Sequence, residues 1–405
     1  MSRHSLKRLK LASFICIALW MIIQIWAVAT FWNAEQIADA GNYHRWAAES
    51  FNSCGWYPNP DQIESEYYIA NPGYVNFLIL NLRLFGSLQF VTIENILFNC
   101  FILLSLFILC RRLAGEASGY WAVIIYCILP SSSIGVVGHM TEFPALALLL
   151  AAFVLCRKKA TSLFAAGVIF FLSEWFRPAA ILYIPTLIGM ALIYKAKPKY
   201  WASFILGVAV SASIVGTLNY QVHGRFMIGS STKGYNMIMG CNDDANGNYD
   251  WRIFEDGNLA DEISKRDYDA LQRDSAYTSE SIKWIAANPG KFLQKIPEKV
   301  YFLWRNDNYA LSAVGVNGNI RNSYIFFVPY AVVILLMFSG LYMKRRQLAG
   351  KAGLIFLPVL LGTAMHTLMY GSSRYHALLM PPVIYFASLA LAKIFAKRHS
   401  SPGNF

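Results

Sequence analysis

The chain has 405 residues, of which 56% are hydrophobic and only 14% are charged. Soluble domains usually carry about 25% charged residues, and apolar runs long enough to cross roughly 30 Å of hydrocarbon recur along this sequence. The composition excludes an ordinary soluble protein and predicts an all-α polytopic membrane protein embedded in a lipid bilayer. We attribute the net charge of +12 to membrane topology and lipid contact, and we expect no nucleic-acid partner.

The first apolar run, Leu11 to Phe31, follows a short basic stretch. It is too long for a signal-peptide core and lacks a small-residue cleavage site, so we interpret it as a retained helix. The apolar segment from Pro72 to Gly86 is expected to lie along the membrane surface as a half-embedded helix. Ten membrane spans are predicted in all, at residues 11–32, 89–110, 119–137, 139–156, 160–173, 175–194, 200–218, 324–343, 350–370 and 377–396.

Basic residues cluster in six places, and ten spans put all six clusters on one face. The positive-inside rule assigns that face to the cytoplasm. Acidic residues show the opposite distribution, since six of the 23 Asp and Glu lie in residues 33–71 and thirteen in residues 219–323. Both termini are therefore predicted inside and both large loops outside, which suits a bacterial inner membrane with a periplasmic site. The basic clusters are Lys7–Lys10, Arg111–Arg112, Arg157–Lys159, Lys195–Lys199, Lys344–Arg346 and Lys397–Arg398.

This topology divides the chain into three regions. Residues 1–218 form an N-terminal transmembrane region that includes the first outer loop (33–88), residues 219–323 form a second outer loop, and residues 324–405 form a C-terminal transmembrane region. Loops of this length are uncommon unless they bind something. The sequence shows no internal repeat, which weakens a transporter interpretation because many transporters consist of repeated halves.

Ionisable residues gather at the outer ends of the predicted spans. Such residues are costly in a membrane and are functional by default. Asp39 lies just past the first span, where a carboxylate can act on a substrate whose reactive head is at the bilayer surface. Three further sets of polar residues are expected on the same face of the membrane, and together they predict a shared polar site. The alternative for each set is a charge at the membrane interface that water or lipid headgroups satisfy. They are His139 with Glu142, Ser173 and Glu174 with Arg177, and Arg374 and Tyr375 with His376.

These residue types suit chemistry on a phosphate-bearing lipid. The guanidinium groups of Arg177 and Arg374 match a phosphate, and Asp39 is the candidate base for a hydroxyl or amine acceptor. Glu142 can help to hold a divalent ion or a sugar hydroxyl. The sequence contains no Walker loop, no zinc-ligand spacing and no nucleophile elbow, so we do not expect ATP-driven, zinc-dependent or serine-nucleophile chemistry.

Two of the seven cysteines, Cys54 and Cys241, lie in the outer loops, one in each. A disulfide between them in an oxidising compartment would pin the first loop over the second. Two free thiols are the alternative. The other five lie in predicted spans, where we expect them to act as small apolar residues.

Several short motifs, taken in order, resemble the GT-C superfamily of membrane glycosyltransferases. Asp39–Tyr43 is similar to the acidic first-loop motif of that superfamily. Asn71–Tyr74 is similar to the Pro-Pro-Gly-Tyr start of its surface helix, with Asn in place of the first Pro. Thr141–Glu142, Arg177–Pro178 and Arg374–Tyr375 follow in the same order as in the family. The group resembled is the bacterial branch of the protein O-mannosyltransferases and lipid A aminoarabinose transferases, which are family-39-like glycosyltransferases.

The resemblance implies transfer of a sugar from a polyprenyl-phosphate donor to a lipid, glycan or protein acceptor on the outer face, with inversion at the anomeric carbon. Asp39 would deprotonate the acceptor, and cations would steady the phosphate leaving group. Some members use a divalent metal such as Mg or Mn, for which Asp39 and Glu142 are the candidate ligands. The chain has a single first-loop Asp where the eukaryotic enzymes have an Asp-Glu pair, so neither metal dependence nor a protein acceptor follows. The implied substrate-binding residues are Tyr43, His139, Glu142, Glu174, Arg177, Arg374, Tyr375 and His376.

Other functions stay open at this point. A surface-polysaccharide polymerase or ligase is the nearest rival among enzymes, because such proteins carry a large outer loop late in the chain. The first-loop Asp39 favours transfer of single sugars. A transporter or flippase for a lipid-linked substrate would need charged groups near mid-membrane, whereas this sequence places them at one end. In a non-catalytic scaffold Asp39 would be expendable.

Overall fold

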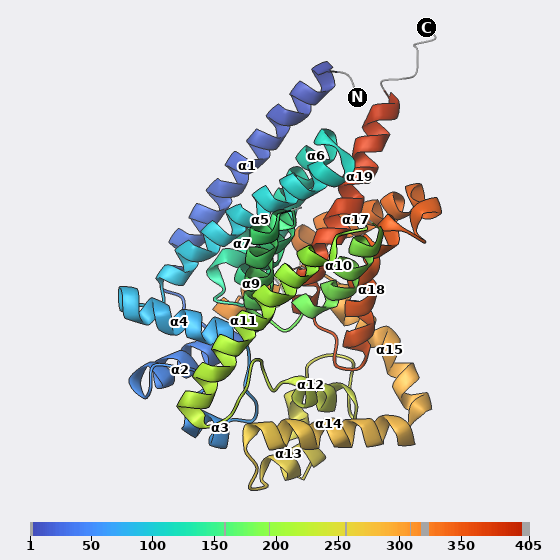
Figure 1. Cartoon of the computed structure of the whole chain (residues 1–405). Helices are drawn as coiled ribbons and strands as arrows, with labels where there is room; N and C mark the ends of the chain where they lie inside the picture. Colours follow the sequence, from blue (N-terminus) through green and yellow to red (C-terminus); the bar gives the residue numbers. More distant parts are fainter. Residues whose placement is uncertain are drawn as a thin grey trace.

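The computed structural model describes residues 3–157, 159–193, 195–255, 257–307, 309–316 and 324–398 (Figure 1). Within these ranges the chain is helical apart from turns, loops and one isolated bridge between Ile69 and Ser231. The predicted all-α membrane class is confirmed. Lys158 of the third basic cluster and residues 317–323 of the second outer loop lie outside the described residues.

A helix or a bent helix pair occupies each of the ten predicted spans. Five helices are long and apolar enough to cross a membrane alone, and a sixth crossing is a pair bent by 72°. The other four are shorter, so the count of ten crossings stays a prediction. The five are α1 (Arg3–Phe31), α5 (Phe90–Ala114), α11 (Pro198–His223), α17 (Tyr324–Met343) and η6 with α19 (Ser373–Leu379, Met380–Arg398). The bent pair is α6 (Glu116–Ile128) with α7 (Pro130–Ile134) and η1 (Gly135–Val137), and the shorter helices are α8 (Glu142–Leu155), α9 (Ala160–Phe176), η2 with α10 (Ala180–Tyr183, Ile184–Ile193) and α18 (Lys351–Thr367).

Glycines let α9 and α11 pack with their backbones almost touching. A Cβ atom on Gly167 would lie 2.1 Å from the carbonyl oxygen of Phe204, and one on Gly207 would lie 2.2 Å from that of Phe164. Small residues at such crossings replace the hydrophobic driving force that helices lack within lipid. The contact fixes α9, whose C-terminal end carries Arg177.

The basic connections lie at one end of the bundle and the outer-loop helices lie at the other (Figure 1). Arg112, at the end of α5, donates a hydrogen bond to the carbonyl of Val154 at 2.9 Å, which brings two basic connections together. The ring of Trp121 packs against Phe395, near the end of α19, with centroids 5.0 Å apart. The start of α1 and the end of α19 lie at this same end. This arrangement agrees with the predicted separation of basic connections from acidic loops.

Both outer loops fold into short helices. The first contains α2 (Ala38–Asn52), α3 (Pro60–Ser65) and α4 (Pro72–Phe85), and α4 coincides with the predicted surface helix. The second loop contains α12 (Lys233–Gly240), η3 (Trp251–Phe254), α13 (Leu259–Ser264), α14 (Ala270–Ala287), α15 (Pro289–Trp304) and η4 (Tyr309–Val314). A short 3-10 turn, η5 (Arg345–Gln347), follows α17.

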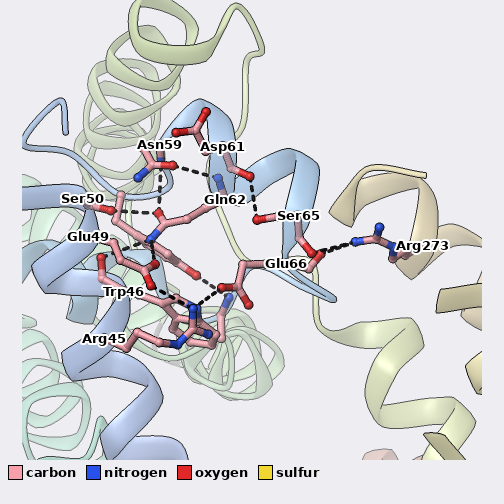
Figure 2. A network of polar contacts seen from close by, with 12 residues as sticks. Arg45, Trp46, Glu49, Ser50, Asn59, Asp61, Gln62, Ser65, Glu66 and Arg273 are labelled. Atoms are coloured by element: carbon pink, nitrogen blue, oxygen red, sulfur yellow. Dashed lines mark hydrogen bonds and ion pairs between the residues drawn. The ribbon is translucent and has the colours of Figure 1, made fainter. Parts of the chain in front are cut away.

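A polar network centred on Gln62 holds the first loop together (Figure 2). The side-chain oxygen of Gln62 accepts hydrogen bonds from the Ser50 hydroxyl at 2.8 Å and from the Asn59 backbone N–H at 3.1 Å. Its amide donates to the Trp46 carbonyl and to Glu49. Arg273 of α14 donates to the carbonyls of Ser65 and Glu66, which ties the second loop to the first. The network therefore fixes α2, the helix that carries Asp39.

We expect Gln62→Leu to lower the stability of the protein by about 1–3 kcal/mol, because it leaves the buried Ser50 hydroxyl and Asn59 N–H without their acceptor. The matched control is Ser65→Ala in the same helix, which removes only a bond to the Asp61 carbonyl at an exposed position. Thermal unfolding in detergent measures both. Equal melting temperatures for the two variants would contradict a structural role for the network.

Of the two alternatives that the sequence left open for Cys54 and Cys241, a disulfide or two free thiols, the structure has the free thiols. Cys54 is exposed and donates to the Trp56 carbonyl at 3.2 Å, whereas Cys241 is buried and donates to the Leu368 carbonyl at 3.2 Å. The Arg273 contacts supply the link between the loops that a disulfide would have made.

Candidate functional site

Asp39 lies in the first turn of α2, which the chain enters through extended backbone at Ile37 and a left-handed residue, Ala38, with φ of 52°. The Ile37 N–H donates to the carbonyl of Ala313 at 2.8 Å, so the second outer loop fixes where the helix begins. A carboxylate in the first turn interacts favourably with the helix dipole. The side chain of Asp39 is 48% exposed, which leaves it accessible to a substrate.

Glu142, in the first turn of α8, is buried between two guanidinium groups. Arg177, the residue directly after α9, donates from Nη1 to Glu142 Oε1 at 2.8 Å and to the Thr141 hydroxyl at 2.8 Å. The Nε of Arg374 donates to the same carboxylate oxygen. A buried carboxylate is tolerated only when it is paired and hydrogen-bonded. Glu142 therefore acts as a fixed anion that positions both arginines.

Arg374, in η6, joins the separate elements of the site. Besides Glu142, it donates from Nη1 to Asp39 Oδ2 and from Nη2 to the Tyr43 hydroxyl, the latter at 2.9 Å. The Tyr43 hydroxyl also accepts from the Asn71 side chain at 2.7 Å. Burial raises the pKa of Tyr43, so its hydroxyl stays protonated. Because a guanidinium presents its donors in a rigid plane, these contacts fix the positions of Asp39 and Tyr43 relative to Glu142.

These groups line a cavity of about 220 Å³ beneath the outer loops. Asp39, Arg177, Arg374 and Tyr375 reach it, and the Arg177 guanidinium lies 5.3 Å from the centre of the Tyr375 ring. Most of the other lining residues were not predicted as site residues, because they reach the cavity only through the packing of distant segments against one another. They include Trp46, Tyr68, Asn71, Lys233, Tyr235, Tyr249, His366 and Tyr370. Tyr is only slightly more frequent in the outer loops than in the whole chain, so composition gave little signal for these residues.

A second, apolar groove of about 470 Å³ has lining residues that are neighbours in sequence of those that line the cavity. It lies between α4, α9 and α11, and its lining includes Trp175 and Phe176, which directly precede Arg177. The last turn of α9 therefore contributes to both spaces. Other groove residues are Trp56, Phe77, Leu80, Phe171, Ile214 and Leu218.

Three of the predicted site residues lie elsewhere. His139 contacts the side chains of His44 and Thr92, at 2.8 Å each, and lines a different cavity. Glu174 accepts from the backbone N–H of Ile181 at 2.9 Å and so supports the start of η2. His376 is fully buried, 2.8 Å from the Leu303 carbonyl and stacked on Trp304. Since successive residues of a 3-10 helix are turned by about 120°, His376 points away from the side that Arg374 faces.

The two carboxylates do not fit a divalent metal as they stand. Mg²⁺ and similar ions need several oxygen ligands around one point, but Asp39 and Glu142 both face the Arg374 guanidinium. A cation placed between them would be repelled by that group. Across the described ranges, no set of three or more His, Cys, Asp or Glu is arranged to hold a metal ion.

Comparison with solved structures finds a likeness to ArnT from Cupriavidus metallidurans, an aminoarabinose transferase. The structure bound to undecaprenyl phosphate shares 12% identity with this chain, with a TM-score of 0.38, and the match covers 95% of this chain and 79% of that one. The apo structure shares 13% identity with this chain, with a TM-score of 0.39, and that match covers 94% of this chain and 77% of the other. No family model matches the sequence, and a search of curated proteins gives no match.

Proposed function

We propose that this protein is a membrane glycosyltransferase that passes a sugar from a polyprenyl-phosphate donor to an acceptor at the outer face of the membrane. The observation that carries the proposal is at the end of α9, where Trp175 and Phe176 line an apolar groove and the next residue, Arg177, lines a polar pocket. A polyprenyl-phosphate sugar has the matching composition, since a long apolar chain ends in an anionic phosphate and a polar sugar.

The donor phosphate is assigned to the basic side of the pocket. Two acids, Asp39 and Glu142, balance Arg177 and Arg374. Lys233 also lines the pocket, and no ion pair joins it to another described side chain. The pocket therefore carries a net positive charge, which favours a phosphate. The aromatic residues Tyr68, Tyr235 and Tyr249 offer ring faces and hydroxyls to the sugar or the acceptor.

Asp39 is assigned as the general base. Arg374 holds its Oδ2, while the structure gives Oδ1 no partner among the described residues. In the proposed step Oδ1 takes the proton of the acceptor hydroxyl or amine as that group attacks the anomeric carbon. The bond from the anomeric carbon to the phosphate oxygen breaks with inversion, and the electron pair leaves on the polyprenyl phosphate. The cations of the pocket stabilise the negative charge that develops there.

A transfer assay tests this proposal directly. Purified protein is incubated with a panel of undecaprenyl-phosphate sugars and with lipid, glycan and peptide acceptors. We expect one donor to release undecaprenyl phosphate and its sugar to appear on one acceptor. If the protein in vesicles instead moves an intact donor from one membrane leaflet to the other and cleaves no donor, it is a flippase.

We expect Ile214→Trp to raise the KM for a long-chain donor by roughly tenfold, because the larger side chain fills the groove between α4 and α11. The KM for a sugar-phosphate donor that carries no polyprenyl chain should change little, since such a donor does not occupy the groove. Steady-state kinetics with the two donors give the comparison. An equal rise for both donors would place the lipid chain elsewhere. The control is Ile205→Trp, a similarly exposed position on α11 outside the groove.

A further inference from the structure

A separate cavity of about 620 Å³ lies at the opposite end of the bundle. It is bounded by the connection between α8 and α9 and by the connection between α10 and α11. The 17 residues of α9, at about 1.5 Å per residue, separate it from Arg177 by roughly 25 Å. Neither the resemblance nor the proposed transfer reaction uses it.

The mouth of this cavity is cationic and its walls are apolar. Arg157, Lys195 and Lys197 are exposed at the mouth, and no ion pair joins any of them to another described side chain. No acidic residue is found in the lining, whose apolar walls include Leu187, Met190 and Phe204. Three neighbouring like charges repel one another, so this mouth is stabilised by an anion.

The backbone holds the two connections in place. The chain turns at Lys195, with φ of 47°, and the N–H of Ala196 donates to the Ala191 carbonyl at 3.0 Å. Pro198 then starts α11, as its fixed φ favours. In the other connection the Ser162 hydroxyl donates to the Leu155 carbonyl at 2.6 Å. These hydrogen bonds fix described backbone on either side of the charged residues.

We propose that this cavity binds an anionic phospholipid of the leaflet on the side of the termini, with the phosphate at Arg157, Lys195 and Lys197 and an acyl chain along the apolar walls. Basic pockets between helices at the cytoplasmic surface recognise anionic headgroups in this way. Trp201 and Tyr200 also line the cavity, and such residues prefer the headgroup level of the bilayer. A zwitterionic lipid fits less well, because its own cation faces three protein cations.

The test measures lipid binding to delipidated full-length protein by native mass spectrometry, with phosphatidylglycerol, phosphatidylcholine and undecaprenyl phosphate as separate probes. We expect tight binding of phosphatidylglycerol and a loss on the order of 100-fold in the triple variant Arg157→Gln, Lys195→Gln, Lys197→Gln, since each charge contributes roughly a factor of five. The matched control is Lys344→Gln, Arg345→Gln, Arg346→Gln, which removes three charges from the connection after α17. Two of these side chains already bond to Gln347 and Tyr342.

A second variant, Met190→Trp, fills the cavity and leaves its charges intact. It should also weaken phosphatidylglycerol binding, which separates a built site from simple attraction to a basic surface. Three results would each overturn the proposal. They are a loss of phosphatidylglycerol binding in the control triple variant as large as in the Arg157, Lys195 and Lys197 variant, binding of phosphatidylcholine as tight as that of phosphatidylglycerol, and unchanged phosphatidylglycerol binding in Met190→Trp. Selective displacement of phosphatidylglycerol by undecaprenyl phosphate would assign the cavity to the carrier lipid instead and would also overturn it.

Discussion

Replacement of Asp39 by Asn should abolish sugar transfer while preserving the fold and donor binding. Asn keeps the volume of Asp and can still accept a bond from Arg374, but it lacks a basic oxygen. Loss of a general base typically costs about 10²–10⁴-fold in rate, and a weak nucleophile such as a hydroxyl should lie near the upper end. The loss should fall on kcat, with little change in KM for the donor. Turnover of a labelled polyprenyl-phosphate sugar, in variants of equal melting temperature, is the measurement.

Two companion variants make this test specific. Asp39→Glu should recover little activity, because one methylene moves the carboxylate by about 1 Å, and a misplacement of that size can cost about 100-fold. Glu35→Gln is the control, since Glu35 is exposed and lies outside the pocket that contains Asp39. Near wild-type turnover in Asp39→Asn would remove the base from the mechanism and would favour the transporter and scaffold alternatives.

The positions of the apolar helices were predictable because hydrophobic length and helix boundaries are local properties of a sequence. The apolar runs that form α1 and α5 are recognisable because each is long enough to cross a bilayer. Pro72 and Pro198 mark the first residues of α4 and α11. The positive-inside rule predicted that the basic connections lie together at one end of the helix bundle. None of these inferences needs knowledge of which helices touch.

The composition of the site was only partly predictable, because it depends on side-chain direction and on contacts between distant segments. The sequence placed Arg374 and His376 together at one helix start, yet Arg374 faces the pocket and His376 packs under Trp304. Lys233 and Tyr235 reach the pocket only because the second loop folds back over the bundle. That long-range packing leaves no periodic pattern in the sequence.

Arg374→Lys should lower kcat/KM by more than 100-fold, a larger loss than conservation of charge would suggest. The arginine uses three different nitrogens to reach Glu142, Asp39 and Tyr43. The single ammonium of lysine cannot satisfy three divergent partners, so Asp39 and Tyr43 lose their fixed positions. Both kcat and the KM for the donor should change, which distinguishes this variant from Asp39→Asn. Initial rates at varied donor concentration measure the two parameters.

Arg177→Lys provides the matched comparison, because Arg177 contacts Glu142 and Thr141 and makes no bond to Asp39. It should raise the KM for the donor while kcat falls less than in Arg374→Lys, since the base stays in place. Removing one partner of a buried ion pair can cost about 3–5 kcal/mol, so the melting temperature of each variant is measured first. Full activity in both lysine variants would mean that the phosphate is bound elsewhere. A loss confined to Arg374→Lys would indicate that Arg374 positions Asp39 and that Lys233 holds the phosphate without Arg177.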